Sequence, residues 1–573
     1  MFVTVVPNRN SPPAILVRES YREDGKVKSR TLANLSHLPP ETIEAVRRSL
    51  RGEVLVTLSE AVTIERSLPH GHVAAVLGVA RKLGLEQLLG SKRCRERDIC
   101  LALIVSRVLR PASKLASTAA LRVETRVDTL GELLALDGLT VPEVYAALDW
   151  LLARQPAIES KLAARHLREG SLVLYDLTST WMAGRKCLLS KRGYSRDGQK
   201  DKPQVVFGVL CDAEGRPLAV EVFEGNTGDP KTVSAQVDKV RQRFGLSRVV
   251  LVGDRGMLTE ARIREDLRPH EGLDWITALR APAIRELLEK GALQPELFDV
   301  QDLAEITHPD YPGERLVICK NPLLAAERTR KREELLVATE TKLRAIVVAT
   351  QREKRPLRGK DCIAKRVGRT IGRLKMEKHF EVSIGEDSFT FARKPENIAR
   401  EAALDGFYVV RTSVGPERMA SDEVVKNYKS LSRVERFFRS VKTTDLQVRP
   451  VFHWNSDRVR AHIFVCMLAG YLTWHLRQQL APLLFTDHDK VGAMSKRTSP
   501  VEKAHVSDAA MEKAALKRTS EDLPALSFDG LLRVLATLTR NTISMPGNSG
   551  TFTILAQPTP LQQRALELLG VKL

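Results

Sequence analysis

Apolar residues recur at helical spacing through most of the first third of the chain. Residues 73–88, 98–109 and 141–152 carry them three and four positions apart, which is the period of an amphipathic helix. Ahead of them, residues 1 to about 60 show the pattern of a strand pair followed by one helix. The sequence therefore predicts an N-terminal region, residues 1–168, that begins with two strands and continues as helices.

The pattern changes at residue 171, where short apolar runs replace the helical period. Five such runs predict strands, at residues 171–176, 205–210, 218–223, 248–254 and 275–279. A helix is predicted over 232–244, between the third and fourth strands. Another strand is predicted over 406–412, and helices over 422–441 and 462–476. Strands interleaved with helices in this order predict a mixed α/β sheet.

The composition is that of a folded protein with an excess of positive charge. Hydrophobic residues make up 43% of the 573 and charged residues 28%, which excludes a disordered or low-complexity chain. Lysine and arginine number 90 against 70 aspartates and glutamates, so the formal net charge is +20. This excess favours a polyanionic partner, nucleic acid ahead of a membrane surface. A merely basic protein would have the same balance, so charge alone decides little.

Cysteines and apolar runs bear on the cellular compartment. The seven cysteines are scattered and include no Cys-x-x-Cys pair, so we expect neither a disulfide framework nor a zinc ribbon, and a reducing cytoplasm fits. The longest apolar run, residues 463–474, is too short to span a bilayer. The first seven residues have no basic segment ahead of the apolar ones, which indicates a strand and not a signal peptide.

Two basic segments stand out from this background. Residues 351–378 hold eleven Lys or Arg against three Asp or Glu, a local excess that favours phosphate contact over a solvated arm. A proline and three glycines interrupt the segment, so one regular helix is not expected. Its candidate phosphate ligands are Lys365, Arg366, Arg369 and Arg373. Residues 106–114 form a basic break between helices. Helices with such basic connections could bind a DNA duplex or could simply have a solvated surface, and the sequence supports the two interpretations equally.

Two aspartates each follow an apolar strand. Asp176 ends the first predicted strand and Asp254 ends the fourth. If these strands are parallel neighbours, both side chains emerge at one sheet edge, a strand spacing apart. Two carboxylates that close repel unless a cation neutralises them, and hard oxygen ligands on open strand ends suit Mg²⁺. The alternative is that each aspartate caps the turn that follows its strand.

A third carboxylate, Glu435, shares the face of a predicted helix with three other polar residues. Tyr428 and Lys442 are each seven positions from Glu435, and Arg439 is four positions after it. One stripe therefore presents a phenol, a carboxylate, a guanidinium and an ammonium. An ordinary surface helix with an internal Glu–Arg pair accounts for Glu435 and Arg439, but not for the register of the tyrosine and the lysine.

These motifs together resemble a bacterial insertion-sequence transposase of the DDE type, whose catalytic core has a ribonuclease H-like fold. Asp176-Leu177-Thr178 resembles the Asp-x-Thr pattern of the family, and Asp254-Arg255-Gly256 resembles its Asp-x-Gly pattern. The resemblance covers roughly residues 171–477, with a gap. Each motif alone is weak, whereas the ordered set of three acids is specific.

The closest class has a signature of Tyr, two residues, Arg, three residues, Glu, six residues and Lys. Tyr428, Glu435 and Lys442 match its spacing. The arginine position holds Leu431 instead. Either Arg439 makes the phosphate contact of that arginine, or this chain lacks the contact.

The resemblance implies an enzyme that cuts transposon ends and joins them to target DNA. Its catalytic residues would be Asp176, Asp254 and Glu435, which would hold two Mg²⁺ ions, with Mn²⁺ as a substitute. The other polar residues of the stripe would hold the phosphates beside the cut. The implied partners are double-stranded DNA, as terminal inverted repeats and as target, and further copies of the chain in a homodimer or larger assembly. The expected location is the bacterial cytoplasm, on the nucleoid when bound to DNA, with no membrane partner.

The spacing of the acids predicts an insertion in the core. The first two lie 78 residues apart and the last two 181, more than a compact sheet needs before its acidic helix. The expected division is 1–168 for recognition of DNA ends, 169–284 and 405–480 for the catalytic core, 285–404 for a basic insertion, and 481–573 for a C-terminal linker with short helices. The insertion has five aromatic residues but no tryptophan to hold a flipped base, so the cleavage route stays open.

Two other functions stay open on the sequence alone. A nuclease or resolvase on the same fold would hydrolyse DNA without strand transfer. A non-catalytic DNA-binding protein descended from a transposase would keep the basic surfaces and lose acids. Because all three acids are present, the non-catalytic alternative is the less supported.

Overall fold

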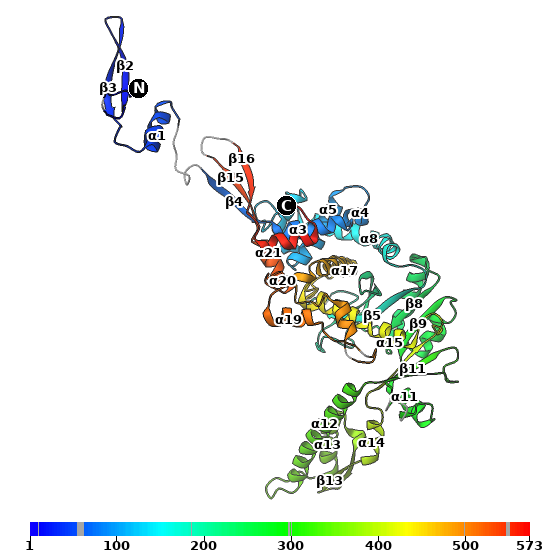
Figure 1. Cartoon of the computed structure of the whole chain (residues 1–573). Coiled ribbons are helices and arrows are strands. Elements are labelled where there is room, and N and C mark those ends of the chain that lie inside the picture. The colour runs from blue at the N-terminus through cyan, green and yellow to red at the C-terminus, as the bar shows by residue number, and fades with distance from the viewer. Residues whose placement is uncertain are drawn as a thin grey trace. The chain divides into compact units, whose positions relative to one another are not determined.

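The computed structural model shows two compact units (Figure 1). It describes residues 1–9, 11–53, 62–184, 186–295, 298, 301–497, 499–502, 504–545 and 550–573. One unit comprises Met1–Pro69 and Leu538–Gln557, and the other comprises His70–Thr537 and Pro558–Leu573. No helix in these described ranges is long and apolar enough to cross a membrane.

The smaller unit begins with a three-stranded antiparallel sheet followed by a helix. Its elements are β1 (Phe2–Val6), β2 (Ala14–Glu23), β3 (Lys26–Asn34) and α1 (Pro40–Leu50). The sequence predicted a strand pair here, and that prediction missed one strand. Every residue of β3 is exposed, so the alternation that marks a half-buried strand is absent. The Asp24–Gly25 pair that connects β2 and β3, both at positive φ, is the turn signal that would have revealed it.

The second sheet of this unit joins the two ends of the chain. It contains β4 (Thr63–Pro69), β15 (Thr539–Ser544) and β16 (Thr551–Leu555) in the order β16-β15-β4. The sequence predicted only a linker and short helices after residue 480. β15 and β16 correct that expectation, and their polar residues explain why no apolar run revealed them.

The larger unit opens with helices that pack on a long apolar helix from later in the chain. They are α3 (Gly71–Lys82), α4 (Leu85–Leu89), α5 (Arg95–Leu109), α6 (Lys114–Leu121), α7 (Leu130–Leu133) and α8 (Val141–His166). The later helix is α17 (Ser456–Gln479), which contacts α3, α5, α8 and β7. α17 is buried along most of its length, so it links the helical layer to the sheet.

An eight-stranded mixed sheet forms the centre of this unit, in the order β10-β11-β14-β9-β8-β5-β6-β7. Its strands are β5 (Ser171–Trp181), β6 (Gln204–Asp212), β7 (Pro217–Glu224), β8 (Val249–Gly253), β9 (Leu273–Ala278), β10 (Leu303–Ile306), β11 (Arg315–Lys320) and β14 (Phe407–Thr412). β5, β8 and β9 are parallel, whereas the other neighbours are antiparallel. The mixed α/β sheet predicted from the sequence is confirmed.

Short helical segments connect the strands on either side of β8. Before it come η1 (Asp229–Thr232), α9 (Val233–Asp238) and the π-turn η2 (Lys239–Arg243). After it come α10 (Glu260–Arg262), the π-turn η3 (Ile263–Leu267) and, past β9, α11 (Ala281–Glu289). The helix predicted over 232–244 is therefore three short segments of different pitch.

Residues 322–405 leave the sheet after β11 and return at β14; we call them the α12–α14 module. They hold α12 (Pro322–Thr350), α13 (Lys360–Leu374), η5 (Glu377–His379), β12 (Phe380–Ile384), β13 (Phe389–Arg393) and α14 (Pro395–Ala402), grouped together in Figure 1. Leu336, Leu343, Ile363, Val367 and Phe380 are among the residues of its own apolar core. β10 and β11, which the sequence placed within the insertion, extend the main sheet.

The remaining helices follow β14. They are α15 (Ser421–Lys429), α16 (Leu431–Arg439), the π-turn η6 (Ser440–Thr444), η7 (Ala481–Leu483), α18 (Lys490–Ser495), α19 (Asp508–Leu516), α20 (Phe528–Ala536) and α21 (Pro560–Leu569). The single helix predicted over 422–441 is interrupted at Ser430 and closes in a π-turn. Both interruptions change the direction of side chains relative to a regular helix.

Candidate active site

Asp176 and Asp254 lie side by side at one edge of the sheet. β5 and β8 are parallel neighbours, and Tyr175 is in register with Gly253, so the next residue on each strand is an aspartate. Neighbouring strands are about 4.8 Å apart. The predicted parallel pairing of the two strands is confirmed. The prediction that Asp176 ends its strand is wrong, because β5 continues to Trp181 by pairing with β6.

The carboxyl group of Asp176 is poorly solvated and faces two other acids. Burial, followed by the charges of Asp254 and Glu435, raises its pKa to about 7, whereas Arg196 opposes the shift. Its Oδ1 accepts a hydrogen bond from the Leu177 N–H at 2.7 Å. Because both acids act on this pKa, the structure brings the three predicted carboxylates into one electrostatic environment.

Asp254 is exposed and has two roles in the geometry. Its Oδ2 accepts a hydrogen bond from the Gly256 N–H at 3.1 Å, so it caps the turn after β8, as the simpler interpretation of the sequence expected. It also stands beside Asp176 at the strand end. The cap uses one carboxylate oxygen and leaves the other available to a ligand.

Glu435 is positioned by the apolar side of α16. Val434, Phe437 and Phe438 are buried, and the Phe438 ring meets Phe207 of β6 edge to face, with centroids 5.8 Å apart. α16 also contacts β5, the strand that carries Asp176. The exposed Glu435 lies beside this apolar side, on a helix that is anchored on the sheet.

The structure keeps Tyr428 near the acids. Burial, followed by the charge of Asp254 and more weakly those of Glu435 and Asp176, raises the Tyr428 pKa to about 12. Its phenol is therefore neutral at physiological pH and can donate a hydrogen bond.

Lys442 lies in the π-turn after α16, not on a continuous helix. Its Nζ donates to Asp197 Oδ1 at 2.8 Å, and Arg449 lies 2.7 Å from the other carboxylate oxygen. The sequence analysis missed Asp197, which lies in the charged loop between β5 and β6. That cluster of charges directly after the first acidic strand was a signal that could have drawn attention to it.

Arg439 is exposed and shares the outward side of α16 with Glu435. Within the described part of the chain it has no hydrogen bond or ion pair through its guanidinium, so the Glu435–Arg439 surface pair of the alternative interpretation is not formed. Arg433 differs, because its guanidinium donates to the Ala213 carbonyl and lies 3.7 Å from Glu214. Arg433 thus packs on the β6–β7 hairpin.

The four candidate cations of the α12–α14 module lie on the regular helix α13. Residues 351–378 are not one regular helix, as expected, because α13 begins only after Pro356 and Gly359, although Gly368 and Gly372 lie inside it. Ile363, Val367 and Ile371 are buried on one side. Lys365, Arg366, Arg369 and Arg373 are exposed on the other and form no ion pair within the described ranges. Spacings of four residues place Lys365, Arg369 and Arg373 along one stripe.

The three carboxylates fit a divalent cation in their chemistry. They offer hard oxygen donors at an open strand edge, and the raised pKa of Asp176 shows that nearby positive charge would be favourable. No group of three or more His, Cys, Asp or Glu side chains within the described residues is arranged to ligate an ion. Rotation of the exposed Asp254 and Glu435 side chains would be needed to form one.

The chain matches two families of known proteins. Residues 171–472 match the transposase DDE domain family, and residues 3–55 match the N-terminal domain of IS1634 family transposases. No curated protein matches the chain. Among solved structures, a piggyBac transposase synaptic complex with hairpin DNA has 9% sequence identity and a TM-score of 0.33, covering 70% of this chain and 72% of that chain.

The first match spans more than half of the 573 residues. The chain belongs to the DDE-domain transposases, enzymes of transposition, and is an insertion-sequence transposase. Membership of this family implies dependence on a divalent metal ion.

Proposed function

We propose that this transposase cuts the ends of its element and joins them to target DNA with Asp176, Asp254 and Glu435 as its catalytic acids. The observation that supports the proposal is the parallel register of β5 and β8, which places Asp176 beside Asp254. After burial, the charges of Asp254 and Glu435 raise the pKa of Asp176. The strand order β7-β6-β5-β8-β9 supports a ribonuclease H-like core around this site. β10, β11 and β14 extend that core.

The acids are proposed to hold two Mg²⁺ ions, which Mn²⁺ can replace. Bound there, the cations would offset phosphate charge and lower the pKa of the attacking hydroxyl. Burial and the neighbouring carboxylates raise the pKa of Asp176 in the metal-free protein, and bound cations would favour its ionised form. Tyr428 can donate a hydrogen bond to a phosphate oxygen, because its phenol stays neutral.

Arg439 is proposed to replace the signature arginine missing at Leu431. Its guanidinium is exposed and without a protein partner in the described residues, so it is available to a phosphate. Lys442 belongs to the same proposed contact, although Asp197 now holds its ammonium. The class signature of Tyr, Arg, Glu and Lys is therefore proposed in a modified form.

The exposed cations of α13 are proposed to contact the phosphates of double-stranded DNA. Lys365, Arg366, Arg369 and Arg373 form a surface with no carboxylate partner in the described ranges. Residues 1–168 are proposed to recognise the terminal repeats, and 169–284 and 405–480 to form the catalytic core. Of the expected insertion 285–404, β10 and β11 belong to the sheet of that core, so the α12–α14 module is proposed to embrace the DNA. Residues 481–573 are proposed as a C-terminal extension of the core. A homodimer or larger assembly is proposed to pair two DNA ends in the bacterial cytoplasm.

A strand-transfer experiment tests this function. The purified chain is incubated with Mg²⁺, a labelled duplex that carries the terminal repeats of its element, and a supercoiled target plasmid. Joined products that disappear in Asp176→Asn support a transposase that uses this acid. Nicked ends without joined products would instead identify a nuclease or resolvase.

A further inference from the structure

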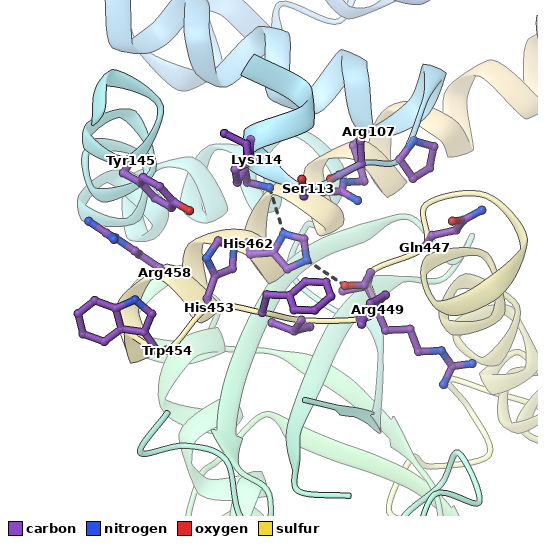
Figure 2. Close-up of a pocket in the computed structure, with 17 residues that line it drawn as sticks. Arg107, Ser113, Lys114, Tyr145, Gln447, Arg449, His453, Trp454, Arg458 and His462 are labelled. Atoms are coloured by element: carbon purple, nitrogen blue, oxygen red, sulfur yellow. Dashed lines mark hydrogen bonds between the residues drawn. The ribbon is translucent and has the colours of Figure 1, made fainter. Parts of the chain in front are cut away.

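A second pocket lies outside the catalytic acids, between the helical layer and the segment that precedes α17. It is a cavity of about 360 Å³, lined by α5, α6, α8, α17 and residues 447–454 (Figure 2). This is within the size range of small-ligand sites. All of its residues belong to the larger unit.

Lys114 and His462 point toward one another inside this pocket (Figure 2). The Lys114 side chain is 4% exposed, and its Nζ lies 3.2 Å from His462 Nδ1. His462 Nε2 lies 2.9 Å from the Val448 carbonyl oxygen. That contact assigns the ring proton to Nε2 and leaves Nδ1 to accept from the ammonium. Among the described residues, the Lys114 amine therefore has a neutral partner and no carboxylate, and burial lowers its pKa to about 7.

Other cations line the same cavity; of these, Arg449 pairs with Asp197 at 2.7 Å, outside the lining. Arg107 is 6% exposed and donates to the Ala112 carbonyl at 2.9 Å. Arg458 stacks 4.2 Å from the Tyr145 ring, and its Nε is buried without a hydrogen-bond partner. No Asp or Glu lines the pocket. Buried cations normally have an anionic partner, so the pocket has the charge of an anion site.

Aromatic rings accompany these cations. Trp454 and Phe452 are both 64% exposed, which is unusual for two large rings on one short segment. His453, between them, meets the Tyr145 ring edge to face at 6.1 Å. A positive groove with aromatic faces is the combination by which proteins hold single-stranded nucleic acid without sequence preference.

The pocket lies within reach of the DNA strand at the acids. Val451 pairs with Met182 and accepts a hydrogen bond from the Ala183 N–H at 3.0 Å, just past the end of β5. Met182 is six residues after Asp176, a distance of about 20 Å along an extended strand. A DNA strand held at the acids would therefore reach the pocket within a few nucleotides.

We propose that this pocket binds an unpaired nucleotide of the DNA substrate, with the phosphate at Lys114, Arg107 and Arg458 and the base against Trp454. The proposal rests on the proposed function, because it assigns a second contact for the same DNA. In this proposal the pocket holds a single strand of DNA, whereas the three acids carry out the chemistry.

Binding of single-stranded DNA by the full chain tests the proposal. The probe is a labelled twelve-nucleotide oligothymidine, and a duplex of the same length is measured in parallel. Trp454→Ala removes an exposed ring and should raise the single-strand Kd about tenfold or more, with the duplex Kd almost unchanged. Arg458→Gln should act in the same direction. Phe485→Ala, which removes a 49% exposed ring outside the pocket lining, is the matched control.

A crosslinking experiment and a competition experiment identify the chemistry of the ligand. An oligothymidine with 5-iodouracil should crosslink to the Trp454 peptide on irradiation. Thymidine monophosphate should compete better than thymidine or inorganic phosphate, because the pocket offers both charge and rings; a phosphate site alone would respond to both phosphates equally.

Several results would overturn the proposal. Absence of single-strand binding by the wild type, an unchanged Kd in Trp454→Ala, or equal losses for duplex and single strand would each do so. Strand transfer by the wild-type protein is scored on the same preparation. If the wild type shows strand transfer but its single-strand binding does not depend on Trp454, the proposed function stands and the pocket proposal is overturned. If strand transfer alone is absent, the proposed function is contradicted and the pocket proposal is not.

Discussion

Lys442 and Asp197 form a buried ion pair, with Nζ 2.8 Å from Oδ1 and side chains 11% and 6% exposed. The lysine follows the helix that carries Glu435, and the aspartate lies in the loop after the strand that carries Asp176. Arg449 is the second cation on this carboxylate, at 2.7 Å. The pair therefore ties the helix of one acid to the strand of another.

Removal of this carboxylate should destabilise the fold. Asp197→Ala leaves Lys442 and Arg449 without their counter-charge, and breaking a buried pair costs about 3–5 kcal/mol. Urea unfolding measures the change. Adding Lys442→Met to Asp197→Ala should cost less than the sum of the single changes. Asp457→Ala, which breaks an exposed pair with Arg460, is the control, and a loss as large as that of Asp197→Ala would contradict the role of burial.

Each of the three acids should be required for cleavage. Asp176→Asn, Asp254→Asn and Glu435→Gln keep the side-chain size but remove an anionic metal ligand, so nicking of a labelled transposon end in Mg²⁺ should disappear while end binding survives. Asp238→Asn provides the control, because that exposed carboxylate accepts only from Gln242 among the described residues. Full nicking activity in any one acid variant would remove that residue from the site.

The stability of the metal-free protein should fall as pH rises. The folded-state pKa of Asp176 is raised from the ordinary 3.8 to about 7, so the folded state binds this proton more tightly than the unfolded state. The resulting stabilisation is present below about pH 4 and is lost as pH rises through 7, by up to roughly 4 kcal/mol. Unfolding in EDTA at several pH values measures it.

Two comparisons identify the cause of that pH dependence. Asp176→Asn should flatten the profile and make the metal-free protein more stable than wild type at pH 8. Mg²⁺ should restore the wild type at pH 8 and leave the variant almost unchanged. A wild-type profile with the same slope as the variant would show that Asp176 does not titrate in this range.

Charge on α13 should control the salt dependence of DNA binding. Neutralising Lys365, Arg366, Arg369 and Arg373 together should reduce the slope of log affinity against log salt by up to about 4. As a control, the α12 cations Arg330 and Lys331 are paired with Glu334 and Glu327, so their neutralisation should leave the slope almost unchanged. Equal slopes for wild type and the α13 variant would make this surface a solvated one.

Arg439 should matter more than its neighbour on the same helix. A charged hydrogen bond to phosphate contributes about 1.5–3 kcal/mol, so Arg439→Ala should lower end binding or cleavage tenfold or more. Arg436→Ala is the control, because Arg436 is exposed on α16 but turned about 100° from Glu435. Arg433 cannot serve, since it donates to the Ala213 carbonyl. Leu431→Arg should recover part of the loss, and equal small losses at Arg436 and Arg439 would leave the signature arginine without a replacement.

The strands that carry the acids could be predicted because their signal is local. Residues 249–252 form an uninterrupted apolar run, and the structure has β8 over Val249–Gly253. The end of β8 was predicted where Asp254 emerges, whereas β5 continues five residues past Asp176, to Trp181. The stripe of Tyr428, Glu435 and Lys442 was predicted on the assumption of one regular helix, and the interruptions on either side of α16 redirect the lysine to Asp197.

Long-range pairings could not be predicted in the same way. Lys114 and His462 are 348 positions apart; the lysine ends a predicted basic break between helices and the histidine begins a predicted apolar helix, and neither pattern indicates the other. The period of a helix identifies its buried face but not the partner that covers it. The same holds for β15, which pairs with β4 across almost the whole chain.

The α12–α14 module is joined to the sheet at two points that touch each other. The Asn321 N–H donates to the Gly406 carbonyl at 2.9 Å, and Lys320 is in register with Phe407 on the neighbouring strand. The module also has an apolar core of its own. The chain therefore leaves the sheet at β11 and returns to it on the neighbouring strand β14, so the module is inserted without interrupting the pairing of these two strands. A module attached in this way could be replaced or shortened during evolution while Asp254 and Glu435 keep their positions.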